Sequence, residues 1–182
     1  EISVELMNLN TEKVVNSINF PLKPKEEEYS GPYECKIATE MNFIVAAYRY
    51  INRLEIYKLS DQKIQLNTII GDANNQYDLY RLNKDSEMIF HYSDIVCGKN
   101  QIYALYQGVK ERELSSANSK IEVYAYDGTH LRTFDLGRNI EKILVDESSM
   151  RIYAFDKNEE EDIMFCYAIE SNTVSFQNWR ID

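Results

Sequence analysis

The chain has 182 residues, a formal net charge of −10 at pH 7 and 14 tyrosines. That length supplies one domain with enough apolar side chains for a core, and the tyrosines suit half-buried strands. The negative charge argues against nucleic-acid binding and against docking on anionic lipid, since both need a basic surface. No apolar run approaches the length of a membrane span and no signal-peptide pattern is present, so we expect neither feature in this chain.

The first predicted element is a hairpin within residues 1–20. Val4 and Val14 lie ten residues apart, with Asn10-Thr11 at the turn between them. The same spacing recurs in three later segments, so we expect this hairpin to be the outer half of a repeating unit.

The first complete unit is expected at residues 33–70. Its first strand is predicted at 34–39, its second contains the Ile-Val-Ala-Ala run at 44–47, and its third begins at Leu54. Leu54 and Ile64 are again ten residues apart across a turn sequence. Short alternating strands joined by turns predict a four-stranded antiparallel meander.

Two long connections interrupt the repeat. Residues 71–91 form an insertion, in which segments 79–82 and 87–92 are expected to add a hairpin, and residues 107–119 lengthen a loop of the next unit. Long loops on a regular scaffold often carry binding surfaces, and tolerated surface insertions are the alternative.

The second unit is expected at residues 92–136, with strands predicted at 93–97, at the Ile-Tyr-Ala-Leu run of 102–105 and from Ile121 onward. Its last turn contains Asp127-Gly128, a strong hairpin signal because a type I′ turn needs positive φ at both central positions.

The third unit is expected at residues 140–178, with strands at 141–146 and at the Ile-Tyr-Ala-Phe run of 152–155. Met164 and Val174 repeat the ten-residue spacing of the closing hairpin.

Units of this size and strand count are typical of β-propeller blades. We therefore predict an all-β fold: a partial β-propeller of about three and a half four-stranded antiparallel blades, in one domain over residues 1–182. The Ile and Ala of the repeated Ile-x-Ala motif share one strand face, and the small Ala would let the neighbouring blade approach closely.

The three cysteines form no CxxC motif, and their odd number does not favour a disulfide framework, although a bond between two of them stays open. Cys166 occupies the strand position of Ile56 and Val123, so we expect it to be buried as an apolar residue.

Three motifs support a family resemblance. They are Ile-Tyr-Ala-Leu-Tyr-Gln-Gly at 102–108, Ile-Glu-Val-Tyr-Ala-Tyr-Asp-Gly at 121–128, and Ile-Leu-Val-Asp-Glu at 143–147 ahead of Ile-Tyr-Ala at 152–154. Through them the stretch 94–155 resembles the TolB-like six-bladed β-propeller proteins of the Bacteroidetes cell envelope. The resemblance implies a periplasmic or outer-membrane-anchored location, often as a lipoprotein, with no established enzymatic activity and no catalytic residues to transfer.

The resemblance covers most of the chain from about Gly31, but the chain is short for a six-bladed ring, which needs roughly 250 residues at about 40–45 per blade. We expect a fragment of a larger propeller, which also agrees with a start at Glu1 in place of Met. A half-ring that closes as a homodimer and an open arc are the alternatives.

No complete catalytic set is visible. His91 and His130 lie in no metal-binding pattern, and the sequence contains neither a Gly-rich phosphate loop nor a Gly-x-Ser-x-Gly elbow. The acidic loop at 156–162 lacks the glycine and distal glutamate of an EF-hand, so we expect it to be solvated. We predict no catalytic residues, no metal site and no cofactor.

Two pairs of residues end matching strands and are expected on one rim: Tyr48 with Arg49, and Tyr106 with Gln107. Aromatic and arginine side chains at a rim suit carbohydrate or peptide recognition, and ordinary strand-end packing is the alternative. Three further tyrosines recur at one strand position and are expected to pack, with hydroxyls that reach water or a blade edge: Tyr57, Tyr124 and Tyr167.

These observations predict a non-catalytic binding module of the bacterial cell envelope that recognises a protein or glycan through rim loops. The alternative is a metal-dependent hydrolase or lyase that uses the central channel, where the inner-strand candidates are Glu34, Asp94 and Glu141. A purely structural role is a third reading, which an incomplete ring that dimerises would suit.

Overall fold

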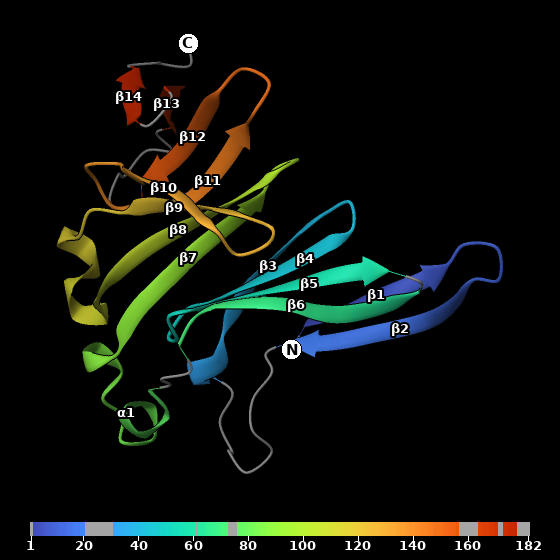
Figure 1. Cartoon of the computed structure of the whole chain (residues 1–182). Coiled ribbons are helices and arrows are strands. Elements are labelled where there is room, and N and C mark those ends of the chain that lie inside the picture. Colours follow the sequence, from blue (N-terminus) through green and yellow to red (C-terminus); the bar gives the residue numbers. More distant parts are fainter. Residues whose placement is uncertain are drawn as a thin grey trace.

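The computed structural model describes residues 2–20, 31–60, 62–72, 76–156, 164–170 and 173–177. Within them, a two-stranded hairpin is followed by three four-stranded antiparallel sheets (Figure 1). Each sheet keeps its strands in chain order, so each is a meander. We call the three sheets the first, second and third blade, and together with the hairpin they form the predicted partial propeller.

The N-terminal hairpin consists of β1 (Ile2–Asn8) and β2 (Lys13–Phe20). The Oδ1 of Asn8 accepts the backbone N–H groups of Asn10 and Thr11, at 2.9 and 3.2 Å, and so fixes the turn. Strand β2 lies against β6, and Phe20 at its end is fully buried. The hairpin therefore occupies the place of a preceding blade.

The first blade follows a short 3₁₀ turn, η1 (Gly31–Tyr33). Its four strands are β3 (Cys35–Glu40), β4 (Phe43–Tyr48), β5 (Arg53–Ser60) and β6 (Lys63–Gly71).

The insertion after the first blade differs from its prediction. The expected hairpin of segments 79–82 and 87–92 is wrong: the structure has a helix, α1 (Tyr77–Arg81), and a 3₁₀ turn, η2 (Asp85–Glu87). Residues from Ile89 onward belong to the second blade, because Ile89 pairs with Lys110 at the extended end of the neighbouring strand. Since β7 already pairs with β8 along this stretch, it does not need residues 79–82 as a second strand.

The second blade contains the longest strand, β8, since its first two strands extend into the insertion and into the loop at 107–119. A tight turn lies at Asp127-Gly128, as predicted, with Gly128 at φ +92°. It is not the expected type I′ turn, because Asp127 does not share the positive φ that this turn type needs at both central residues. Its elements are β7 (Ile89–Cys97), β8 (Gln101–Lys110), the 3₁₀ helix η3 (Glu111–Ser116), β9 (Lys120–Ala125) and β10 (His130–Asp135).

The third blade consists of β11 (Ile140–Asp146), β12 (Arg151–Asp156), β13 (Met164–Glu170) and β14 (Thr173–Gln177).

The first strands of the three blades lie side by side in the centre of the arrangement, with β7 in contact with both β3 and β11 (Figure 1). Their pairing register is the same in each blade, because an isoleucine of the first strand is opposite the alanine of the Ile-x-Ala motif. The pairs are Ile37 with Ala46, Ile95 with Ala104, and Ile143 with Ala154.

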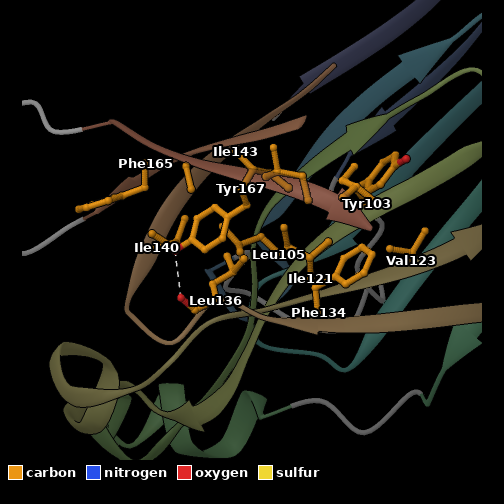
Figure 2. Close-up of a cluster of buried hydrophobic side chains, with 13 residues drawn as sticks. Tyr103, Leu105, Ile121, Val123, Phe134, Leu136, Ile140, Ile143, Phe165 and Tyr167 are labelled. Carbon is orange, nitrogen blue, oxygen red and sulfur yellow. Dashed lines mark hydrogen bonds between the residues drawn. The ribbon is translucent and has the colours of Figure 1, made fainter. Parts of the chain in front are cut away.

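The core is divided into three clusters, each between two successive sheets. The cluster between the second and third blades contains Leu105, Ile121, Phe134 and Tyr167 (Figure 2). The three motif alanines are fully buried, each in the cluster that faces the preceding sheet: Ala46, Ala104 and Ala154. Their small size is what close packing between neighbouring sheets requires.

All three cysteines are free thiols, and Cys166 is 1% exposed, as its strand position predicts. Burial raises the pKa of Cys35 to about 12 and that of Cys97 to about 11, so these thiols stay protonated at neutral pH.

Candidate functional site

A cavity of about 230 Å³ lies among the first strands of the three blades. Its walls include residues from β3, β7 and β11, and from the η3 segment at one end. Clefts to which several structural units contribute are the usual location of ligand sites.

One repeated position supplies three of the lining residues. Lys36, Asp94 and Lys142 each directly precede the isoleucine that pairs with a motif alanine, so they are equivalent in the three blades. All three line the cavity. The repeat thus places a cation, an anion and a second cation around one centre.

The carboxylate of Asp94 joins two blades. Its Oδ2 accepts the backbone N–H of Ile143 at 2.9 Å, which ties β7 to β11. No hydrogen bond reaches its Oδ1 from any residue in the described ranges. One oxygen therefore holds the wall together and the other is available to a ligand.

Arg49 is fixed by several contacts on the first-blade side of the cavity. Its Nη1 lies 2.8 Å from Oε2 of Glu34, and its guanidinium carbon lies 5.3 Å from the centre of the Phe90 ring. Its backbone carbonyl accepts the N–H of His91 at 2.6 Å. This bonding orders the guanidinium and leaves its Nε and Nη2 without hydrogen-bond partners among the described residues.

Gln107 lines the opposite wall, where it bonds the fully buried Ser119 behind it. Gln107 Nε2 donates to Ser119 Oγ at 2.7 Å and to the carbonyl of Ile140 at 2.9 Å. Ser119 Oγ in turn accepts the N–H of Ile140 at 2.7 Å. These bonds join the second blade to β11. The side-chain amide of Gln107 therefore shapes the cavity, and its N–H groups are used within the wall.

Asn139 supplies an acceptor beside this network. It is 6% exposed, and its Nδ2 donates to the carbonyl of Leu114 at 2.6 Å. Its Oδ1 receives no hydrogen bond from the part of the chain that the structure describes, although the residue lines the cavity. A buried amide whose NH₂ group is already bonded, and whose oxygen is not, is a suitable acceptor for a ligand hydroxyl.

The four residues expected on a rim are separated by the fold. Arg49 and Gln107 line the cavity, but Tyr48 is 1% exposed and its hydroxyl donates to Glu55 Oε2 at 3.0 Å. The expectation for Tyr48 is therefore corrected: strand alternation turns its ring into the core while Arg49 turns toward the cavity. Tyr106 is half-buried against the rings of Tyr92 and His91, and its role in binding stays a prediction.

The recurring tyrosines also differ from expectation, because their hydroxyls bond inside the core. Tyr57 donates to Glu55 at 2.6 Å and Tyr124 donates to Glu122 at 2.8 Å. Tyr167 donates to a backbone carbonyl, that of Leu136, at 2.9 Å (Figure 2). The sequence contained a signal for the first two, because Glu-x-Tyr occurs at the same strand position in both copies.

Sequence reasoning missed Lys36, Lys142 and Asn139. The first two had a usable signal, since a charged residue precedes the first-strand isoleucine in all three copies. Asn139 had none, because its place depends on how η3 folds back against β11.

No group of three or more His, Cys, Asp or Glu side chains that would hold a metal ion occurs within the described ranges. Of the three carboxylates considered for a metal-dependent enzyme, Asp94 and Glu141 line the cavity while Glu34 pairs with Arg49. His130 bonds Thr133, and burial lowers the pKa of His91. Residues 157–162 of the acidic loop lie outside the described residues.

A protein-family model described as TolB-like 6-blade propeller-like matches residues 28–148. No curated protein sequence matches the chain. None of the helices in the described residues is long and apolar enough to cross a membrane.

Proposed function

The chain belongs to the TolB-like 6-blade propeller-like family, and we propose that it is a non-catalytic binding module that recognises a glycan in the cavity among its first strands. The observation that carries this proposal is the set of polar groups in the cavity wall that internal hydrogen bonds leave unused. A protein segment is the alternative ligand, and the experiment below separates the two.

The unused groups come from all three blades. The first blade supplies Lys36, the second supplies Asp94 Oδ1, and the third supplies Lys142, with Asn139 Oδ1 between the second and third. Polar groups held by a rigid scaffold recognise a ligand without the cost of ordering loops on binding. The small volume suits one or two sugar units better than a folded protein surface.

The location proposed for this module is the cell envelope, in the periplasm or anchored to the outer membrane. Membership of the TolB-like family supports it, and lipid attachment and a complete six-bladed ring belong to the same proposal. Completion of the ring by a second copy is a separate prediction, which a monomer in light scattering would contradict.

A metal-dependent hydrolase or lyase is the competing function, because Asp94 and Glu141 line the same cavity. Cleavage of a bound saccharide in the presence of added divalent cation would support it against the binding module.

The test is a titration of the protein with a panel of saccharides prepared from envelope polysaccharide and with short peptides. We expect at least one saccharide to raise the melting temperature and to be recovered unchanged by mass spectrometry. Asp94→Asn should weaken that binding, because it removes a charge and keeps an oxygen for Ile143. The matched control is Asp78→Asn on α1, an exposed position outside the cavity.

Three results contradict the proposal. Binding of peptides alone would assign a protein ligand, and saccharide cleavage would assign an enzyme. Saccharide binding that Asp94→Asn and Asp78→Asn affect equally would place the ligand elsewhere.

A further inference from the structure

The cavity contains cations that the fold does not neutralise. Lys36 and Lys142 line it, and neither forms an ion pair within the described ranges. Arg49 shares only one of its guanidinium nitrogens with Glu34. The cavity lining of this acidic chain holds these three cations beside three carboxylates, those of Asp94, Glu111 and Glu141. Asp94 and Glu111 each already accept a hydrogen bond, from the Ile143 N–H and the Tyr50 hydroxyl.

The same walls carry hydrogen-bond acceptors. Asp94 Oδ1 and Asn139 Oδ1 have no partners in the described part of the chain, and the Ser93 hydroxyl makes only a long contact of 3.5 Å with the carbonyl of Leu105. Acceptors of this kind pair with ligand hydroxyl or ammonium groups. Because Asn139 and Ser93 are neutral, they favour hydroxyls over an ammonium group.

A ligand that satisfies both sets of groups carries an anion and several hydroxyls on one small frame. A neutral sugar would leave the lysines unused, and a compact anion such as phosphate would leave the hydrogen-bond acceptors unused. Resting on the proposed function, we infer that the glycan is an acidic one and that the cavity binds a uronic-acid unit, with the carboxylate toward Lys36, Lys142 and Arg49.

The arrangement assigns different roles to the two sides of the ligand. The lysine ammonium groups act as point charges on flexible stems and attract the carboxylate, and the ordered guanidinium of Arg49 is able to orient it. Asp94 and Asn139 then accept from ring hydroxyls on the β11 side. No covalent step is involved, and the ligand leaves unchanged.

The test is calorimetric titration with galacturonate and glucuronate, using galactose and glucose as matched probes that lack only the carboxylate. We expect at least one uronate to bind about tenfold or more tightly than its neutral counterpart, and added NaCl to weaken it. Inorganic phosphate is the probe for an anion site without sugar recognition, and glycylglycine is the probe for a peptide.

The variants are Lys36→Met and Lys142→Met, each of which removes a charge and keeps an apolar stem. Each should weaken uronate binding about tenfold, a larger loss than either variant causes for the matched neutral sugar. The control is Lys58→Met, an exposed position on β5 outside the cavity. Urea midpoints equal to wild type will show that the variants fold.

Equal affinity for a uronate and its neutral sugar overturns this inference and leaves the proposed function intact. Phosphate or glycylglycine that binds as tightly as the uronates overturns it too, as does uronate binding that the two lysine variants do not change. Failure of both uronates to bind at millimolar concentration overturns the inference alone, since the saccharide panel tests the proposed function separately.

Discussion

The first and third blades differ at one equivalent position of their third strand. The residue opposite the motif alanine is Glu55 in the first blade, Glu122 in the second and Phe165 in the third. The backbone register is the same in all three, so the repeat fixes where this side chain points. It leaves open whether the space between sheets is filled by a charged cluster or by an apolar one.

In the first blade this position forms a buried charged cluster. Glu55 is 2% exposed, and its carboxylate lies 2.6 Å from Arg53 Nη2 while it accepts the hydroxyls of Tyr48 and Tyr57 at 3.0 and 2.6 Å. The second blade repeats part of this, because Glu122 accepts the hydroxyls of Tyr92 and Tyr124.

In the third blade an arginine from the connection between β10 and β11 stacks on the aromatic ring at this position. Phe165 takes the place of the glutamate, and the guanidinium carbon of Arg138 lies 3.8 Å from its ring centre and 5.3 Å from that of Phe176. Tyr167 loses its carboxylate partner and bonds the Leu136 carbonyl. The comparison teaches that one fold position tolerates two chemistries, each with partners for the tyrosine hydroxyls beside it. The buried Nε of Arg53 is an exception in the first blade, because it has no hydrogen-bond partner among the described residues.

Replacement of Glu55 should have the largest effect. Glu55→Ala leaves the Arg53 charge and two tyrosine hydroxyls without their acceptor, and we expect a loss of about 3 kcal/mol in the free energy of unfolding. Urea unfolding measures it. The matched variant Glu122→Ala should cost less, about 2 kcal/mol, because it removes two hydroxyl bonds and no ion pair. Equal losses in the two blades would contradict this ranking.

Removal of single tyrosine hydroxyls should distinguish a bond to the charged Glu55 carboxylate from a bond to the neutral Leu136 carbonyl. Tyr57→Phe should cost about 2 kcal/mol, since its bond goes to a carboxylate, and Tyr167→Phe about 1 kcal/mol, since its bond goes to a backbone carbonyl. Chemical denaturation of both variants against wild type gives the two values. The order would be reversed if the Glu55 cluster were open to water.

Alkaline pH should weaken the two clusters. Burial, with the neighbouring glutamate, raises the pKa of Tyr57 and Tyr124 above the usual value near 10, so the folded state holds the phenolic proton more tightly than the unfolded chain. Their contribution is complete below pH 10 and is lost as pH rises beyond it, by up to about 1.4 kcal/mol per pH unit for each tyrosine.

Melting temperatures between pH 8 and 11 test this. Wild type should lose stability more steeply above pH 10 than the double variant Tyr57→Phe, Tyr124→Phe. Parallel curves for the two proteins would count against buried, protonated tyrosines.

Much of the fold is visible in the sequence, because strand alternation and turn spacing are local properties. The Ile-x-Ala motif and the ten-residue hairpins predict the strands of all three blades and the N-terminal hairpin. The hairpin expected within the insertion was wrong, because residues from Ile89 pair with the far end of β8 and residues 77–81 form a helix. Of the four residues expected on a rim, Arg49 and Gln107 line the cavity, and a binding role for them stays a prediction. Tyr48 is buried with its hydroxyl on Glu55, a contact between strands that spacing alone does not reveal.

Changes in the cavity should leave stability almost unaffected, in contrast to changes in the clusters. Lys142→Met removes an exposed charge that has no ion pair among the described residues, so the free energy of unfolding should stay within about 0.5 kcal/mol of wild type. Urea unfolding checks it. A loss as large as that of Glu55→Ala would mean that the cavity lysines serve the fold.

The central claim is that equivalent positions of the three first strands form one binding site. Its most direct test is protein-observed NMR during titration with the tightest-binding saccharide of the panel. We predict the largest amide shifts at Lys36, Asp94 and Lys142, with β6 and β10 unchanged. Amide shifts concentrated on β6 and β10, with no change in the first strands β3, β7 and β11, would contradict the account.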